Sequence, residues 1–600
     1  MRLIDANTGF LKEFSPRKKP KYAVLSHRWT KDEVTFLDVQ AKTFRDTSSL
    51  DKFWGSLRQA RRDGLKSVWI DTCCIDKQSS AELSEAINSM YRWYQGAEYC
   101  YVYLHDVDKD TWQESFLKSK WFTRGWTLQE LLAPPSVIFY DRQWQPLGDR
   151  KTLAGVISDV TGIELAALET GDLHRYSIAQ KMSWAAKRVT SRPEDSAYCL
   201  MGLFGVNMPL LYGEGERAFL RLQEEIIKYN DDHSIFAWSM GRKKFSGLLA
   251  PAPACFVGSD KIVSSESSEG REPYSMTNRG LSIKLKIRPW SVDTYLAYLD
   301  CADKTVSKGG IKVGIFLRRL TKDDQYTRVK VSEKGLWLGG NGTYHMPRDL
   351  IRERQLFVRQ TLDFDREKDC LKDREYGFKV SYGWLPSSAR ILAAHYLLDN
   401  CLALLPLGGW GCAMVIDISA QREGISKIAL GFDFEFHPIC LLEDSSSVAQ
   451  HLDAKADNYS EWSSILSNAV EWHKITVGSH VYNSSNHDGI WRLRGHRLKS
   501  LNVLLPQSFM NKGSMVTLQR DKGRSELVWE LKIDNLIGPF RNHYHNALEK
   551  PFGDRWGFQK ACRLDMTDED LERGDEILKT KFPSIGHIEP DRTPLQLTVT

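Results

Sequence analysis

One carboxylate inside an apolar segment is the residue of this sequence best suited to chemistry. Three apolar residues follow Glu130 directly, and Trp126 precedes it by four positions. At helical spacing Trp126 and Glu130 share a face, so the carboxylate is expected to lie against an indole. Apolar surroundings raise a carboxyl pKa and suit the group to act as a catalytic acid, base or charge stabiliser. The alternative is a helix-end glutamate that offsets the helix dipole or pairs with Arg124.

A short apolar strand upstream is predicted to deliver polar side chains at its carboxyl end. The strand covers residues 22–25, and the residues that follow it are Ser26, His27, Arg28 and Trp29. The next segment is predicted to begin a helix, because Thr30 can cap it and Glu33 stands at capping-box spacing.

A second strand, at residues 67–70, ends in Asp71. The helix predicted after it has Ser79 as N-cap and Glu82 three residues later. Further strands are predicted at residues 99–104 and 136–140. This alternation is typical of a mainly parallel sheet with helices on both faces, in which ligands collect at the carboxyl edge. We therefore expect the residues that end the first two strands to lie together.

Three blocks within residues 22–140 closely resemble the fungal heterokaryon-incompatibility (HET) domain. They are YAVLSHRW (22–29), VWIDTCCIDK (68–77) and RGWTLQEL (124–131). The likeness continues to about residue 240, through RPEDSAYCLMG (192–202) and MPLLYGEG (208–215). The resemblance implies a protein of filamentous fungi that triggers regulated cell death when unlike individuals fuse, or in related immune responses. It also implies an allelic or immune protein partner, whose identity the sequence does not give.

The same blocks are similar, in order, to plant-type Toll/interleukin-1 receptor (TIR) domains. That resemblance implies a flavodoxin-like fold in which Glu130 is the catalytic glutamate of NAD cleavage. It implies a nucleotide pocket bordered by Ser26, His27, Arg28, Trp29, Asp71 and Trp126. Two positions depart from the TIR pattern, since Trp29 stands for a small glycine and Thr127 for a cysteine.

The chemistry expected of such a site is the loss of nicotinamide from NAD. Cleavage of the nicotinamide–ribose bond passes through an oxocarbenium-like transition state, which a carboxylate beside the ribose stabilises. NAD is then a substrate, and no cofactor is expected. Self-association is expected as well, because related domains complete their pockets with a neighbouring subunit. The alternative function is a non-enzymatic assembly module that kills through partner interactions. For Asp71 the alternative role is a strand-end cap, and for His27 it is a packed polar residue.

Composition narrows the class of protein. The 600 residues are 42% hydrophobic and 26% charged, with a net charge of +5, which is ordinary for a globular protein. The sequence has no dense basic stripe of the kind that binds nucleic acid, and it has no cysteine or histidine spacing that is typical of a metal site. Eleven scattered cysteines favour a reducing cytoplasm. No signal peptide or membrane span is predicted. The Gly213-Glu214-Gly215 run imitates a dinucleotide motif but is interpreted as a helix start.

The chain is predicted to contain four regions. Residues 1–150 form the α/β domain, and residues 151–240 form a helical extension of it. Residues 241–272 are expected to be a linker or loop, because residues 264–270 are a polar, serine-rich run. Residues 273–600 show period-two alternation and are predicted to be β-rich, with room for two antiparallel sub-domains.

Overall fold

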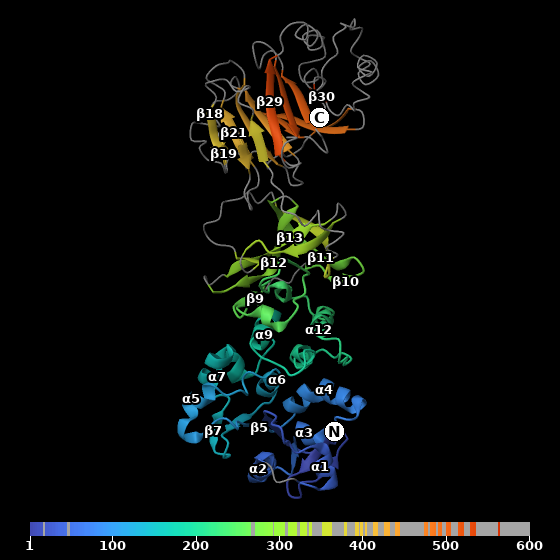
Figure 1. Ribbon diagram of the computed structural model, residues 1–600, viewed down its shortest axis with the longest axis vertical. Helices are drawn as coiled ribbons and strands as arrows, with labels where there is room; N and C mark the ends of the chain where they lie inside the picture. The colour runs from blue at the N-terminus through green and yellow to red at the C-terminus, as the bar shows by residue number, and fades with distance from the viewer. Residues whose placement is uncertain are drawn as a thin grey trace.

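The computed structural model describes residues 1–362 with short gaps, and beyond them a set of strands between Gly377 and Arg563. The gaps before residue 362 are 16–17, 45–47, 266–270, 292, 306–309, 321–323, 333–334 and 339–350. The N-terminal α/β domain, the helical region and the β-rich sheets follow one another along the long axis of the molecule (Figure 1).

The N-terminal domain is built on a seven-stranded sheet in the order β2-β1-β4-β3-β5-β6-β7. Its strands are β1 (Arg2–Asp5), β2 (Leu11–Glu13), β3 (Ala23–His27), β4 (Ser67–Trp69), β5 (Tyr99–Tyr103), β6 (Val137–Tyr140) and β7 (Pro146–Asp149). The four central strands are parallel, whereas β1, β2 and β7 pair antiparallel at the two edges. The residues of β3 and β4 are all buried, as expected for parallel strands covered on both faces. The prediction of a mainly parallel sheet is confirmed.

The helices of this domain connect the parallel strands. They are α1 (Phe36–Ala41), α2 (Ser48–Arg62), α3 (Asp71–Cys74), α4 (Ser80–Gln95), α5 (Trp112–Leu117) and α6 (Thr127–Leu132), with the 3-10 turn η1 (Lys109–Thr111) before α5. The predicted cap of α4 is confirmed, because the Ser79 side chain accepts a hydrogen bond from the backbone N–H of Glu82. The predicted helix start at Thr30 is wrong. Helix α1 begins later, with Thr35 as its N-cap, because the Glu33 carboxylate belongs to a buried ion cluster.

The helical extension packs directly on the α/β domain. Its elements are α7 (Ala154–Thr161), α8 (Leu165–Thr170), α9 (Ile178–Ala185), α10 (Asp195–Tyr198), α11 (Met201–Phe204), α12 (Arg217–Ile227) and the 3-10 turn η2 (His233–Phe236). A Cβ at Gly202 would lie 2.1 Å from the Cβ of Tyr91, so only glycine permits this approach of α11 to α4. The side chain of Asn88 on α4 also bonds both backbone groups of Met208.

The segment at residues 241–272 differs from the expected linker. It contains β8 (Phe245–Ser246), the 3-10 turn η3 (Pro253–Phe256) and β9 (Ile262–Ser264). Strand β8 pairs with β14 (Gln325–Val329), and β9 pairs with β12 (Thr294–Asp303). Leu248 and Leu249 are buried in the core, and burying this apolar pair ties the segment to the sheet. The serine-rich residues that suggested a linker, at 266–270, lie outside the described residues.

The remaining strands confirm a β-rich region after the helices. A nine-stranded sheet, mostly antiparallel, combines β8, β9, β12 and β14 with further strands. These are β10 (Ser275–Thr277), β11 (Gly280–Ser291), β13 (Ile311–Arg319), β15 (Leu336–Leu338) and β16 (Arg352–Val358). Buried Arg328 on β14 donates hydrogen bonds to the carbonyls of Phe236 and Trp238. This sheet is therefore attached to the end of the helical extension.

Two seven-stranded sheets follow. The first contains β17 (Gly377–Val380), β19 (Leu397–Asp399), β20 (Leu402–Leu404), β27 (Ser500–Leu505), β28 (Ser514–Arg520), β29 (Val528–Asn535) and β30 (Cys562–Arg563). The second contains β18 (Arg390–Ala394), β21 (Cys412–Asp417), β22 (Ile425–Phe432), β23 (Pro438–Asp444), β24 (His473–Val477), β25 (His480–His487) and β26 (Ile490–Arg494). The division of this region into sub-domains stays a prediction. Within the described residues, no helix has the length and apolar character needed to cross a membrane.

Candidate functional site

Glu130 lies on α6, a short helix whose six residues are all buried. A helix end leaves backbone carbonyls without helical partners, and Arg150 supplies donors for them. Its Nη1 donates to the carbonyls of Leu131 at 2.8 Å and Pro134 at 3.0 Å. A buried guanidinium at this end also complements the helix dipole. The helix that carries Glu130 is therefore fixed at its C-terminus.

The start of α6 is held by the helical extension. The backbone N–H of Gly125 donates to the Val189 carbonyl at 2.9 Å, and the N–H of Val189 donates to the Thr123 carbonyl at 2.7 Å. Arg188 Nη1 also donates to Thr127 Oγ1 at 2.9 Å. These bonds join two segments more than sixty residues apart in the chain. The orientation of Glu130 therefore depends on residues well beyond the α/β domain.

Glu130 is buried, with only 8% of the residue exposed. Ser26 at the end of β3 donates a hydrogen bond from Oγ to Glu130 Oε2. Ser26 Oγ in turn accepts a hydrogen bond of 2.9 Å from Trp121 Nε1. The structure thus brings Glu130 into direct contact with Ser26, as the sequence analysis expects. Trp121 is a member of this cluster that the sequence analysis missed.

Burial raises the pKa of Glu130 to about 8. The Ser26 hydrogen bond opposes this shift, the negative charge of Asp71 adds to it, and the positive charges of Arg124 and Arg188 lower the pKa slightly. A carboxyl group with this pKa is mostly protonated at pH 7 and becomes ionised when its surroundings favour the charge. Glu130 therefore has the perturbed protonation equilibrium that is typical of functional carboxyl groups.

Trp126 and Arg124 have partners other than those the sequence analysis considered. Trp126 lies at the N-cap of α6, where its side chain opposes the rise in the pKa of the Asp195 carboxyl group that burial causes. Arg124 Nη1 donates to Ser191 Oγ at 3.1 Å. The Arg124 contact fastens the loop before α6 to the helical extension.

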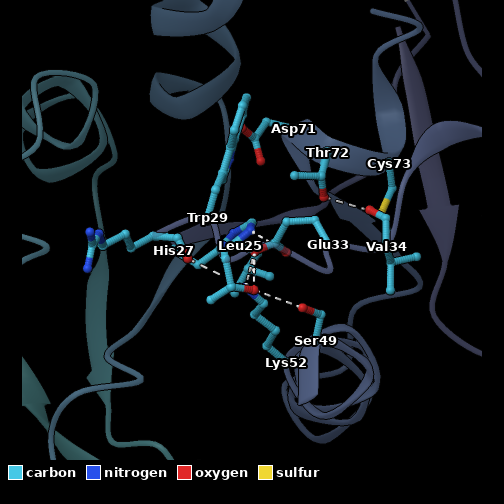
Figure 2. Close-up of polar contacts among 12 residues, drawn as sticks. Leu25, His27, Trp29, Glu33, Val34, Ser49, Lys52, Asp71, Thr72 and Cys73 are labelled. Carbon is cyan, nitrogen blue, oxygen red and sulfur yellow. Dashed lines mark hydrogen bonds and ion pairs between the residues drawn. The ribbon is translucent and has the colours of Figure 1, made fainter. Parts of the chain in front are cut away.

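A second cluster at the end of β3 is an ion network (Figure 2). His27 Nε2 lies 3.3 Å from Glu33 Oε2, and the Lys52 ammonium forms an ion pair with the other carboxylate oxygen of Glu33. Burial alone raises the pKa of Glu33, but the ion contacts with His27 and Lys52 bring that pKa down to about 2. His27 is therefore engaged with Glu33 and fits the packed polar role better than direct contact with a ligand.

Trp29 and Asp71 form the outer part of the same edge (Figure 2). The indole N–H of Trp29 donates to Asp71 Oδ2 at 2.8 Å, although the Trp29 side chain is 47% exposed. Lys77 Nζ lies 3.5 Å from the centre of the indole ring, a cation–π contact. Arg28, which precedes Trp29 in the chain, is half-buried. The structure thus joins Trp29 to Asp71 directly and places Asp71 within electrostatic range of Glu130.

The glycine motif before α12 holds an internal anion. The backbone N–H groups of Gly213 and Gly215 donate to Glu194 Oε1 at 2.8 and 3.1 Å. Successive N–H groups of this kind form a nest that binds anions, and here a side chain of the chain fills it. Among the residues that the structure describes, no cluster of histidine, cysteine and acidic residues could hold a metal ion.

Comparisons with known proteins match the part of the chain that includes Ser26, Trp29 and Asp71. A family model described as heterokaryon incompatibility protein (HET) matches residues 22–113, and a domain of unknown function (DUF8212) matches residues 217–308. The vegetative incompatibility protein HET-E-1 of Podospora anserina is 49% identical over 246 residues. That match covers 38% of this chain and only 18% of the Podospora protein. No solved structure matches the chain significantly. Residues 22–113 of this chain therefore resemble the heterokaryon-incompatibility (HET) family.

Proposed function

We propose that the HET domain of this chain cleaves NAD at its nicotinamide–ribose bond and thereby triggers regulated cell death in an incompatibility or immune response. The observation that carries this proposal is the Glu130 carboxyl group, which is buried against Ser26 at the end of β3. The similarity to a vegetative incompatibility protein of Podospora anserina supports the biological context.

The strand order supports a nucleotide site at this edge. Counted along the chain, the four parallel strands lie in the order second-first-third-fourth, as β4-β3-β5-β6. This is the order of flavodoxin-like sheets, which bind ligands beyond the carboxyl ends of the first and third strands. Ser26 and His27 end the first of these strands, β3. The TIR-like motifs occur in the same order along this chain, which also supports a site at the carboxyl ends of the parallel strands.

The chemistry follows from the charge that Glu130 acquires. In the reaction the nicotinamide leaves with the electrons of the glycosidic bond, and water attacks the ribose carbon to give ADP-ribose and a proton. Ionised Glu130 stabilises the oxocarbenium character of the transition state. The positive pyridinium ring of bound NAD favours that ionised form, because a nearby cation lowers a carboxyl pKa.

The alternative function is a non-enzymatic assembly module. Two observations favour it: Glu130 is only 8% exposed, whereas Trp29 is 47% exposed at the same edge. Exposed tryptophan is enriched at protein interfaces. On this alternative, killing follows from contacts of the Trp29 surface with a partner or with a second copy of the chain.

A single substitution separates the two functions. Glu130→Gln keeps the size of the side chain and removes its charge, so NAD cleavage by the full-length protein is expected to fall by roughly a hundred- to a thousand-fold. Glu85→Gln is the matched control, because Glu85 is an exposed residue on α4. Nicotinamide release is measured with purified protein. Cell death and cellular NAD are measured at matched expression.

The two proposals predict opposite results in cells. If NAD cleavage kills, Glu130→Gln abolishes both NAD loss and death, while Glu85→Gln retains them. If Glu130→Gln kills as well as the wild type and cellular NAD is unchanged, the enzymatic proposal is wrong. The assembly-module function then replaces it, and Trp29→Ala is expected to abolish killing.

A further inference from the structure

A hydrogen-bonded chain of three side chains ends at the Glu130 carboxyl group. Trp121 Nε1 donates to Ser26 Oγ at 2.9 Å, and Ser26 Oγ donates to Glu130 Oε2. Trp121 and Ser26 are at most 1% exposed. The Trp121 ring is fixed by edge-to-face contacts with Phe122 and Phe139, which restrict its orientation.

The chemistry of the three groups fixes the direction of this chain. An indole N–H can donate a hydrogen bond but cannot accept one. The Ser26 oxygen is therefore the acceptor toward Trp121, a bond that occupies one of its two lone pairs, and the Ser26 hydroxyl proton is directed at Glu130 Oε2. A carboxyl oxygen that accepts this proton is favoured in its ionised form.

We propose that Trp121 is a positioning residue for Glu130, which acts by holding the Ser26 hydroxyl as a donor toward the carboxylate. This inference deepens the proposed function, since it concerns how the catalytic carboxylate is kept ready to ionise. Without the indole N–H, the Ser26 hydroxyl is free to rotate. Both lone pairs of its oxygen can then accept a hydrogen bond from the O–H of the neutral acid, so the protonated form of Glu130 gains stability.

Other groups face Glu130 and must stay unchanged in a test. Those with electrostatic influence on it or from it are Tyr94 on α4, Cys100 on β5, Asp71 on α3, Arg124 before α6 and Arg188 after α9. Replacing Trp121 by an isostere leaves all of them in place. A change in the titration of Glu130 then reports the lost N–H donor.

The experiment replaces Trp121 in the full chain by 3-benzothienylalanine, which keeps the two-ring shape and lacks the N–H. The control is the same replacement at Trp238, whose buried Nε1 donates to the Leu248 carbonyl at 2.7 Å. The protonated Glu130 carbonyl band is followed against pH by infrared difference spectroscopy, with Glu130→Gln identifying the band. This readout requires no NAD cleavage, so it is independent of whether the proposed function is correct.

The replacement at Trp121 is expected to raise the titration midpoint of Glu130 by about 0.5–1 pH unit, the scale of one hydrogen bond. The replacement at Trp238 is expected to leave the midpoint unchanged. In a Ser26→Ala background, the Trp121 replacement should have no further effect, because the link to Glu130 is already absent. An unchanged midpoint, or an equal shift with and without Ser26, would overturn the proposal.

Discussion

Glu130→Gln is expected to make the protein more stable at alkaline pH while it removes the proposed activity. The wild-type carboxyl group must ionise in a buried site, and its pKa is raised from 4.5 to about 8. The folded protein therefore holds this proton more tightly than the unfolded chain does. The stability that results is fully present below pH 4.5 and is lost as the pH rises to 8. Glutamine does not titrate and avoids this loss.

The size of the effect follows from the two pKa values. One pKa unit corresponds to about 1.36 kcal/mol. The pKa of Glu130 is 4.5 in the unfolded chain and about 8 in the folded protein. Ionisation of Glu130 therefore lowers the free energy of unfolding of the wild type by about 1 kcal/mol at pH 5 and by about 4 kcal/mol at pH 8. The advantage of Glu130→Gln over the wild type should therefore grow by about 3 kcal/mol across this range. For a domain of about 150–250 residues, a difference of about 3 kcal/mol corresponds to a shift in Tm of roughly 6–12 °C.

The assay is thermal unfolding of full-length wild type, Glu130→Gln and Glu85→Gln at pH 5 and pH 8. All other titrating groups are common to the three proteins, so their contributions cancel in the difference. The exposed Glu85 should show no pH-dependent difference from the wild type. A Glu130→Gln protein whose Tm advantage is the same at both pH values would refute the raised pKa and with it the argument for a poised carboxyl group.

Three other predictions test the site and its support. The value of kcat/KM for nicotinamide release should rise about tenfold from pH 7 to pH 9, because Glu130, with a pKa of about 8, goes from about one tenth to nine tenths ionised; a flat profile would contradict this. Gly55→Ala should lower the free energy of unfolding in urea by about 1–3 kcal/mol, because the new Cβ would lie 2.0 Å from Trp144 Nε1. The control Gly155→Ala should be neutral or stabilising, because nothing lies within 4 Å of its new Cβ. Arg150→Met should speed amide hydrogen exchange in α6, because it removes the donors to the carbonyls at the end of that helix; unchanged exchange would mean that α6 is held elsewhere.

Local patterns in the sequence predicted the parts of this fold that depend on local physics. Apolar runs gave the four parallel strands, and the Ser79 cap of α4 followed from a hydroxyl three residues before Glu82. The same spacing misled at Thr30. There Glu33 does accept a hydrogen bond from the Thr30 backbone N–H, but no helix begins at Thr30. The Glu33 carboxylate instead forms buried ion contacts with His27 and Lys52. A capping pattern cannot show which long-range partners compete for the side chain.

The rest of the candidate site could not be predicted because its contacts span the chain. Ser26 meets Glu130 across 104 positions and Trp121 across 95. Helical spacing pairs Glu130 with Trp126, but Trp126 lies at the N-cap of α6, and the hydrogen-bond partner of the Glu130 carboxyl group is Ser26. Trp121 belongs to the turn before the helix, where no periodicity indicates the direction of a side chain. Family resemblance located the carboxylate, whereas its hydrogen-bond partners required the three-dimensional structure.

The unit that positions Glu130 is larger than the region matched by the HET family model. That match ends at residue 113, before the helix that carries Glu130. The loop that starts this helix is bonded to Val189, and α11 reaches α4 through the close contact at Gly202. A fragment that stops after the seventh strand would lose these contacts and leave the start of α6 unsupported.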